Sequence, residues 1–293
     1  MVRRWFRRLS AFDAANVLFL AVLGVLVAYP FIYTVSISVS DAAVVARGGV
    51  TFFPRGLDIN AYKQVLSSHR IWLAYRNTVI YASLGVVIRV FLLVLTAYPL
   101  SRARFPGRNF FMFLIGFTML FNGGMVPTFL VVRGVGLLDT IWAMIIPGAL
   151  GAYNVIIVRT FFQSTIHPSL EESAALDGAN DLQVLFRIVV PLSAPIIAVM
   201  SLFIMVGIWN NYLQALLYLI NENLYPLTII LRDIVVQAEG EEFMGLRELY
   251  RVPVPTQSVQ SATLIVSIIP VLAAYPFIQK YFVKGIMIGA IKG

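Results

Sequence analysis

The feature that most constrains this chain is a series of long stretches without a charged side chain. Five mostly apolar runs each reach the roughly 18 residues that cross about 30 Å of hydrocarbon as a helix. They are Ala14 to Ser40, Asn109 to Val132, Thr140 to Val158, Ile188 to Asn221 and Val252 to Gln279. Only 12% of the residues are charged, and the mean hydropathy is +0.85. The sequence therefore predicts an all-α membrane protein.

A sixth apolar run, from about Trp72 to Leu100, is interrupted only by Arg89. Twelve Val, Ile, Leu and Phe residues lie between Val79 and Leu95. They favour insertion by about 0.4 kcal/mol each, or roughly 5 kcal/mol together, against a cost of about 3 kcal/mol for one arginine. This run should also insert, and we expect six transmembrane helices.

The orientation follows from the arginines that precede the first run. "MVRRWFRRLS" holds four of them, and the positive-inside rule places that end in the cytoplasm. An even number of spans returns the carboxyl terminus there as well. We expect one multi-pass transmembrane domain, 1–293, with a cytoplasmic loop at about 165–187 and an external loop at about 222–251. A cleaved signal peptide is disfavoured, because the first run is longer than the roughly 7–15 apolar residues of such a peptide.

The residues that are missing exclude several kinds of chemistry. The chain has no cysteine and no G-x-x-x-x-G-K-[ST] sequence, so it has neither disulfides nor a P-loop for ATP. The two histidines, His69 and His167, are predicted on opposite sides of the membrane, which leaves no histidine pair for a metal. The net charge of +8 belongs mainly to cytoplasmic ends that face anionic lipid, and nothing in it indicates nucleic acid. We therefore expect a protein that is not an enzyme and binds no metal or cofactor.

One polar stretch, "EESAALDGANDLQVLFRIVVP" at 171–191, differs from its apolar surroundings. Four carboxylates fall within eleven residues of it: Glu171, Glu172, Asp177 and Asp181. Negative charge is favoured in the first turn of a helix by the helix dipole. The stretch predicts two short helices joined at a Gly178 hinge, on the cytoplasmic side and too polar to enter lipid.

Two capping patterns support these helices. Ser169 lies three residues before Glu172 and directly after Pro168, which is the spacing of a capping box at a helix start. Asn180 and Gln183 repeat the same spacing before the apolar run Ile188 to Asn221. By physical chemistry alone, the segment serves equally well as a solvated connector or as a helix that docks in a groove of a cytosolic partner.

The same segment resembles the EAA loop of the permease subunits of binding-protein-dependent ABC importers. Ser173 and Val190 replace an alanine and a leucine of that pattern. The residues that match E-A-A-x-x-D-G-A and the downstream I-x-L-P are Glu172, Ala174, Asp177, Gly178, Ala179, Ile188 and Pro191. "SRARFPGR", "GVGLLDTIWAMIIP", "WNNYL" and "QKYFVKGIMIGAIKG" are similar to the carbohydrate-uptake, MalG-like branch. The stretch before the tail resembles the LplC-like subgroup.

The resemblance implies a type I ABC importer permease fold in a bacterial cytoplasmic (inner) membrane. It implies a second homologous permease, two ATP-binding subunits that carry ATP and Mg²⁺, and a periplasmic or extracellular solute-binding protein. Residues 168–182 would be the coupling helix that sits in a cleft of an ATPase subunit, and the tail 284–293 would add contacts there or anchor to the membrane surface. The subgroup implies an oligosaccharide substrate, including acidic, alginate-type sugars. The predicted ATPase-coupling residues are Glu171, Glu172, Ser173, Ala174, Asp177, Gly178, Ala179 and Pro191.

Candidates for the substrate path lie elsewhere. A sugar path requires aromatic faces together with amides. Both occur near the expected outer end of the run Ile188 to Asn221, at Trp209, Asn210, Asn211 and Tyr212. An aromatic belt at the membrane interface explains Trp209 and Tyr212 equally well. Arg89 lies roughly 15 Å from the cytoplasmic end of its run, and it either lends positive potential to the path or contacts a neighbouring helix.

Two other classes of function are alternatives to the importer subunit. An ion-coupled secondary sugar transporter is the main alternative, but it calls for carboxylates inside the spans, and the apolar runs hold none. A membrane-embedded enzyme would need a catalytic group of residues, which the sequence does not offer.

Overall fold

The computed structural model describes residues 11–243 and 257–273, and every described element is helical or a loop. The amino-terminal arginines, part of the predicted external loop and the tail lie outside these residues. By its internal contacts the chain forms two compact units. One comprises residues 1–69 and 231–268, and the other comprises residues 70–230 and 269–293.

The first unit contains the 28-residue apolar helix α1. Its helices are α1 (Ala11–Ser38), α2 (Ala42–Ala46) and α3 (Asn60–Ser67). Most side chains of α1 are exposed, and only its last turn is buried. There the Ser36 hydroxyl donates to the carbonyl of Phe52 at 2.8 Å, and the hydroxyls of Ser38 and Tyr62 lie 2.8 Å apart. The segment after α1 therefore folds back on the carboxyl end of that helix.

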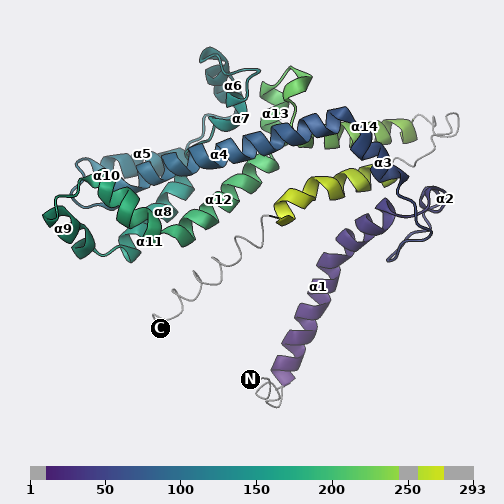
Figure 1. Ribbon diagram of the computed structural model, residues 1–293, viewed down its shortest axis with the longest axis horizontal. Helices are drawn as coiled ribbons and strands as arrows, with labels where there is room; N and C mark the ends of the chain where they lie inside the picture. Colours follow the sequence, from purple (N-terminus) through teal and green to yellow (C-terminus); the bar gives the residue numbers. More distant parts are fainter. Residues whose placement is uncertain (1–10, 244–256, 274–293) are drawn as a thin grey trace. The chain divides into compact units, whose positions relative to one another are not determined.

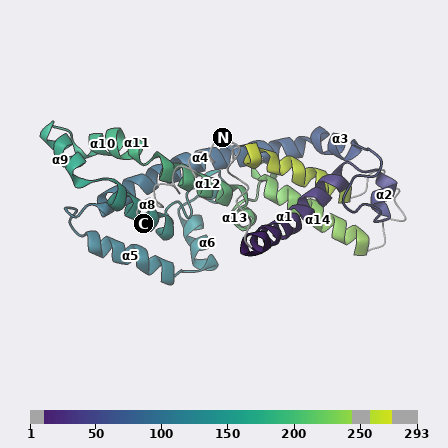
Figure 2. The same cartoon turned by 90° about the horizontal axis from the view of Figure 1, so that it is seen from below.

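The second unit is organised around the 33-residue helix α4 (His69–Ser101), which contains Arg89. The following helices are α5 (Arg108–Leu120), α6 (Met125–Gly134), α7 (Trp142–Ile145), α8 (Ala152–Thr165), α9 (Pro168–Leu176), α10 (Asp181–Val184), α11 (Val190–Leu192), α12 (Ala194–Trp209) and α13 (Tyr212–Tyr218). Figures 1 and 2 both show α9, α10 and α11 gathered at the end of this unit where α4 finishes. Two more helices, α14 (Leu227–Phe243) and Gln257–Ala273, contain residues of both units.

Several predicted spans are broken rather than straight. α5 and α6 are bent by 120° at a break where Gly124 has a φ of +84°, a conformation that glycine adopts without strain. The segment 181–192 is bent by 82° from α12. Ser193 stands between Pro191 and Pro195 at this break, and each proline removes a backbone donor.

The run Thr140 to Val158 is interrupted in the same way, between α7 and α8. Pro147 and Gly148 follow the C-cap residue of α7, Ile146, and Gly148 has a φ of +70°. By length and composition, α1 and α4 are each able to cross a membrane, and counting each bent pair as one span raises the number to four within 11–243 and 257–273. The expected helix of the last run is described over Gln257–Ala273.

The core of the second unit is formed by side chains from distant parts of the chain. Tyr81 of α4, Met144 of α7, Phe162 of α8 and Met200 of α12 are all at most 2% exposed. In lipid, side chains of this kind hold helices together by close van der Waals packing rather than by exclusion from water. This packing holds the discontinuous helices against α4 and positions the polar segment beyond α8.

Candidate functional site

The polar segment begins with a capped helix, and its cap lies two residues earlier than the sequence suggests. α9 starts at Pro168, and the Nδ1 atom of His167 accepts a hydrogen bond from the backbone N–H of Ser169 at 3.3 Å. The predicted cap at Ser169 was therefore wrong. Proline has no backbone N–H and a fixed φ, so it suits the first helical position and moves the cap to His167. The Ser169 hydroxyl lies 2.8 Å from the same histidine nitrogen.

The hinge and the second helix are confirmed. Gly178 has a φ of +82° and ends the first helix. α10 then begins with a complete capping box, in which the side chains of Asn180 and Gln183 each accept from the other residue's backbone N–H at 2.9 Å. A π-helical turn, Leu185–Val189, connects α10 to α11. The segment thus consists of two helical parts that are joined through Gly178.

Burial separates the predicted coupling residues into two groups. Glu171 and Ala174 are buried within the second unit. The exposed or partly exposed members are Glu172, Ser173, Asp177, Gly178, Ala179 and Pro191. Leu176 projects from the end of α9 and is 90% exposed. One face of α9 therefore packs against the protein, and the other exposes a carboxylate and an apolar side chain.

Glu171 has a partner that the sequence analysis missed. Its carboxylate lies 2.6 Å from the guanidinium of Arg102, and both side chains are only 10% exposed. The Arg102 guanidinium also lies 5.0 Å from the centre of the Tyr98 ring, within the range of a cation–π contact. In the sequence, "SRARFPGR" served only as part of the family resemblance. The signal that could have singled out its arginines was the unusual acidity of the segment 171–181.

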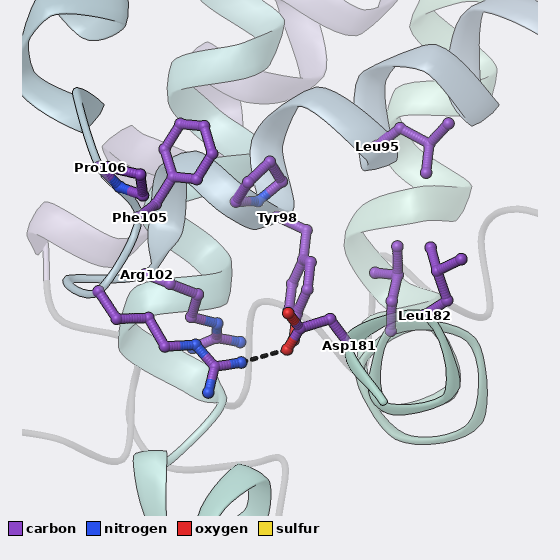
Figure 3. Close-up of a pocket in the computed structure, with 10 residues that line it drawn as sticks. Leu95, Tyr98, Arg102, Phe105, Pro106, Asp181 and Leu182 are labelled. Atoms are coloured by element: carbon purple, nitrogen blue, oxygen red, sulfur yellow. Dashed lines mark hydrogen bonds and ion pairs between the residues drawn. The ribbon is translucent and has the colours of Figure 1, made fainter. Parts of the chain in front are cut away.

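Figure 3 shows a cavity of about 450 Å³ between the end of α4 and α10. Its walls include the ring of Tyr98, the aliphatic side chains of Leu95 and Leu182, and the guanidinium of Arg104. Arg104 forms an ion pair with Asp181 across this cavity. Those two side chains are 59% and 73% exposed, so water screens their attraction.

Arg89, a predicted path residue, lies against α7. Its Nε donates to the carbonyl of Ile145 at 2.9 Å, and one terminal nitrogen donates to Met144 at 3.2 Å and to Pro147 at 3.0 Å. These carbonyls end a four-residue helix and lack partners within it. This geometry supports the structural account of Arg89.

The structure gives the four residues at the carboxyl end of α12 and the start of α13 different surroundings. Trp209 is 8% exposed, and its ring meets that of Tyr75 edge to face with centroids 6.2 Å apart. Asn211 caps α13 by accepting from the backbone N–H of Gln214 at 3.1 Å. Tyr212 is half-buried, and Asn210 is exposed. Asn210 ends α12 as its C-cap residue through its backbone N–H, so of the two amide side chains it is that of Asn211 that caps α13.

A second polar cluster holds the segment 218–227 in place. The Asn77 amide donates to the carbonyl of Asn223 at 2.7 Å, and the Tyr81 hydroxyl donates to that of Leu224 at 2.7 Å. The carboxylate of Asp139 accepts from the backbone N–H groups of Ile220 and Asn221 at 2.8 and 2.7 Å. Within 11–243 and 257–273, no group of three His, Cys, Asp or Glu side chains is placed to hold a metal ion.

Comparison with known proteins places this arrangement in a family. Residues 71–288, which include α4, the whole polar segment and α12, match the family described as binding-protein-dependent transport system inner membrane component. The chain belongs to this family. It is the membrane-spanning, non-catalytic component of an ABC importer, which confirms the expected class and replaces the ion-driven and enzymatic alternatives.

Two proteins of Bacillus subtilis (strain 168) are similar over almost the entire chain. Protein LplC is 39% identical over 282 residues, which are 96% of this chain and 95% of that protein. The polygalacturonan/rhamnogalacturonan transport system permease protein YtcP is 42% identical over 282 residues, covering 96% and 98% of the two chains. The predicted LplC-like relationship is confirmed.

A solved structure supports the fold. A chain from the crystal structure of a bacterial ABC transporter involved in the import of the acidic polysaccharide alginate is 39% identical to this chain. The two superimpose with a TM-score of 0.85, over 92% of this chain and 96% of the other. The chain therefore has the fold of an ABC importer permease.

Proposed function

We propose that this chain is one of two paired permeases in an importer of acidic oligosaccharides, and that residues 168–182 couple it to a partner ATPase. The observation that carries the coupling proposal is the exposed face of α9. A segment that is too polar for lipid presents Glu172 and the 90% exposed Leu176 next to the Gly178 hinge. An apolar side chain beside a carboxylate on a short helix suits a groove in a cytosolic protein.

The proposed topology follows the sequence analysis. Six spans cross the membrane as one domain, 1–293, with both termini, the turn 101–108 and the loop 165–187 in the cytoplasm, and the loop 222–251 outside. The exposed apolar surfaces of α1 and α5 support contacts with lipid and with a second permease. Two ATP-binding subunits and a solute-binding protein complete the proposed complex.

The proposed substrate class rests on two relatives. YtcP is named for polygalacturonan and rhamnogalacturonan transport, and the solved relative belongs to a transporter for alginate. Both names describe polysaccharides rich in uronic acids. We assign this chain an acidic oligosaccharide of the same class, with Asn210 and Tyr212 as path residues and Arg89 as a structural residue.

The coupling proposal is tested by charge reversal on the exposed face. Glu172→Lys should reverse the charge on the exposed face of α9, and the ATPase subunits should no longer co-purify with the inserted permease. Glu222→Lys is the matched control, because Glu222 is also exposed and lies in the proposed external loop. Full ATPase association in Glu172→Lys would return the segment to a solvated connector.

The substrate proposal is tested with the complete reconstituted complex and its binding protein. Stimulation of ATP hydrolysis should be greater with oligouronates than with neutral oligosaccharides of equal length. Equal or greater stimulation by the neutral sugars would reject an acidic substrate and leave the coupling proposal intact.

A further inference from the structure

The end of α4, the helix α8 and the start of α9 are joined by side-chain contacts. Arg159 of α8 donates from its Nε to the carbonyl of Leu100 at 2.9 Å, and Gln163 donates to that of Ser101 at 3.2 Å. These carbonyls belong to the last turn of α4, which has no further helical partner for them. α8 thus fixes the carboxyl end of α4 from one side.

The Arg102–Glu171 ion pair adds the next connection. Arg102 directly follows α4, and Glu171 lies in the first turn of α9. The two groups meet at 2.6 Å and are each 10% exposed. Because little water reaches them, water cannot readily replace either partner, and separating the two charges is much more costly than separating two surface charges. The start of α9 therefore moves together with the end of α4.

The ion pair on the other side of the hinge differs in kind. The side chains of Arg104 and Asp181 are both more than half exposed, so water can replace either partner. Such exposed pairs contribute little and exchange readily. Gly178 stands between Glu171 and Asp181, with nothing within 4 Å of the position that a Cβ would take. The ion pair between α10 and the turn after α4 is therefore easier to break than the ion pair between α9 and that turn.

We propose that Arg102 and Glu171 are a positioning pair that transmits displacement of α9 to the long helix α4. The proposal rests on the docking of α9 to the ATPase proposed above, and it assigns a separate residue to each task. The exposed Glu172 faces the partner, and the buried Glu171 holds the permease's own helix. The exposed pair Arg104–Asp181 takes no part in transmitting the displacement of α9 to α4. Gly178 lets α10 change its angle to α9.

The test compares matched neutral variants on the two sides of the hinge. Arg102→Gln, which lies outside residues 168–182, should keep both ATPase subunits and basal ATP hydrolysis, and Glu171→Gln is compared on the complexes that assemble. The ratio of stimulated to basal hydrolysis, measured with liganded binding protein on assembled complexes, should fall about tenfold or more, because a broken buried pair leaves an unpaired charge. Asp181→Asn and Arg104→Gln should stay within about twofold of the wild-type ratio, because their pair is screened by water.

The charge-swapped variant Arg102→Glu with Glu171→Arg provides the decisive rescue. It should restore the ratio toward the wild-type value, also if a single variant fails to assemble. A wild-type ratio in Glu171→Gln, or a swapped variant that assembles without recovering the ratio, would overturn the proposal. Failure of the coupling proposal itself would be seen elsewhere, as unchanged ATPase association in Glu172→Lys.

Discussion

The guanidinium of Arg89 closes the carboxyl end of α7, with its Nε 2.9 Å from the carbonyl oxygen of Ile145, 56 positions along the chain. Met144 and Pro147 offer their carbonyls to the same side chain. A positive group at a helix carboxyl end is favoured by the helix dipole. A charge within an apolar run is thus balanced by backbone that would otherwise lack donors.

This relationship predicts that Arg89 acts on stability before it acts on transport. Arg89→Gln should destabilise the complex by about 1–3 kcal/mol for each carbonyl that is left without a donor. Arg89→Lys should recover only part of the loss, because an ammonium lacks the planar fork of a guanidinium. Thermal unfolding of the purified complex measures both, with the exposed Arg133→Gln as control. Unchanged stability in the two Arg89 variants, with transport of a charged sugar lost only in Arg89→Gln, would instead place Arg89 on the path.

The second prediction concerns the backbone at Gly178. Its φ of +82° costs roughly 1–2 kcal/mol for a residue with a Cβ, although there is space for one. Gly178→Val should therefore weaken ATPase association or stimulated hydrolysis while the chain still inserts. Gly178→Asn should be milder, because asparagine tolerates this conformation.

Gly116→Ala is the matched control for Gly178. Gly116 lies within α5 and has open space around it, and alanine is a better helix former than glycine. Association and hydrolysis should stay at the wild-type level. Wild-type coupling in Gly178→Val would show that the hinge angle is not needed.

The third prediction tests the proposed topology with single cysteines, for which the cysteine-free chain provides no background. Ala103→Cys and Ser173→Cys should react with an impermeant maleimide only from the cytoplasmic side, and Ser67→Cys only from outside. All three positions are exposed. The nearby Ser101 is unsuitable for labelling, because it is buried and its hydroxyl donates to the carbonyl of Tyr98. Reaction of Ser173→Cys from outside in intact cells would reject the orientation.

The fourth prediction separates two neighbouring amides. Asn211→Ala removes the cap of α13, which should cost about 1 kcal/mol and lower the thermal stability of the complex. Asn210 is exposed and makes no such cap, so Asn210→Ala should keep the stability and reduce the rate of sugar uptake. Equal uptake by Asn210→Ala and the wild type would remove this residue from the proposed path.

The sequence alone determined the class of protein and the position of the polar segment. Uncharged runs predict membrane helices because lipid offers no partner for a charge, and this criterion needs no knowledge of packing. The hinge at Gly178 and the capping box at Asn180 were also predictable. Both are local effects, set by the backbone freedom of glycine and by a side chain that reaches three residues ahead.

Only the tertiary structure decided which carboxylate faces inward and what each arginine contacts. Glu171 and Glu172 are adjacent and chemically identical, and the sequence analysis gave both the same role. Their difference arises because Arg102, 69 positions from Glu171, is brought to one side of α9 by the packing of α4 and α8. Likewise, the partners of Arg89 are carbonyls that any sequence supplies. They accept hydrogen bonds from Arg89 because the chain leaves the helix at Pro147 and Gly148, after α7, where it lies beside α4.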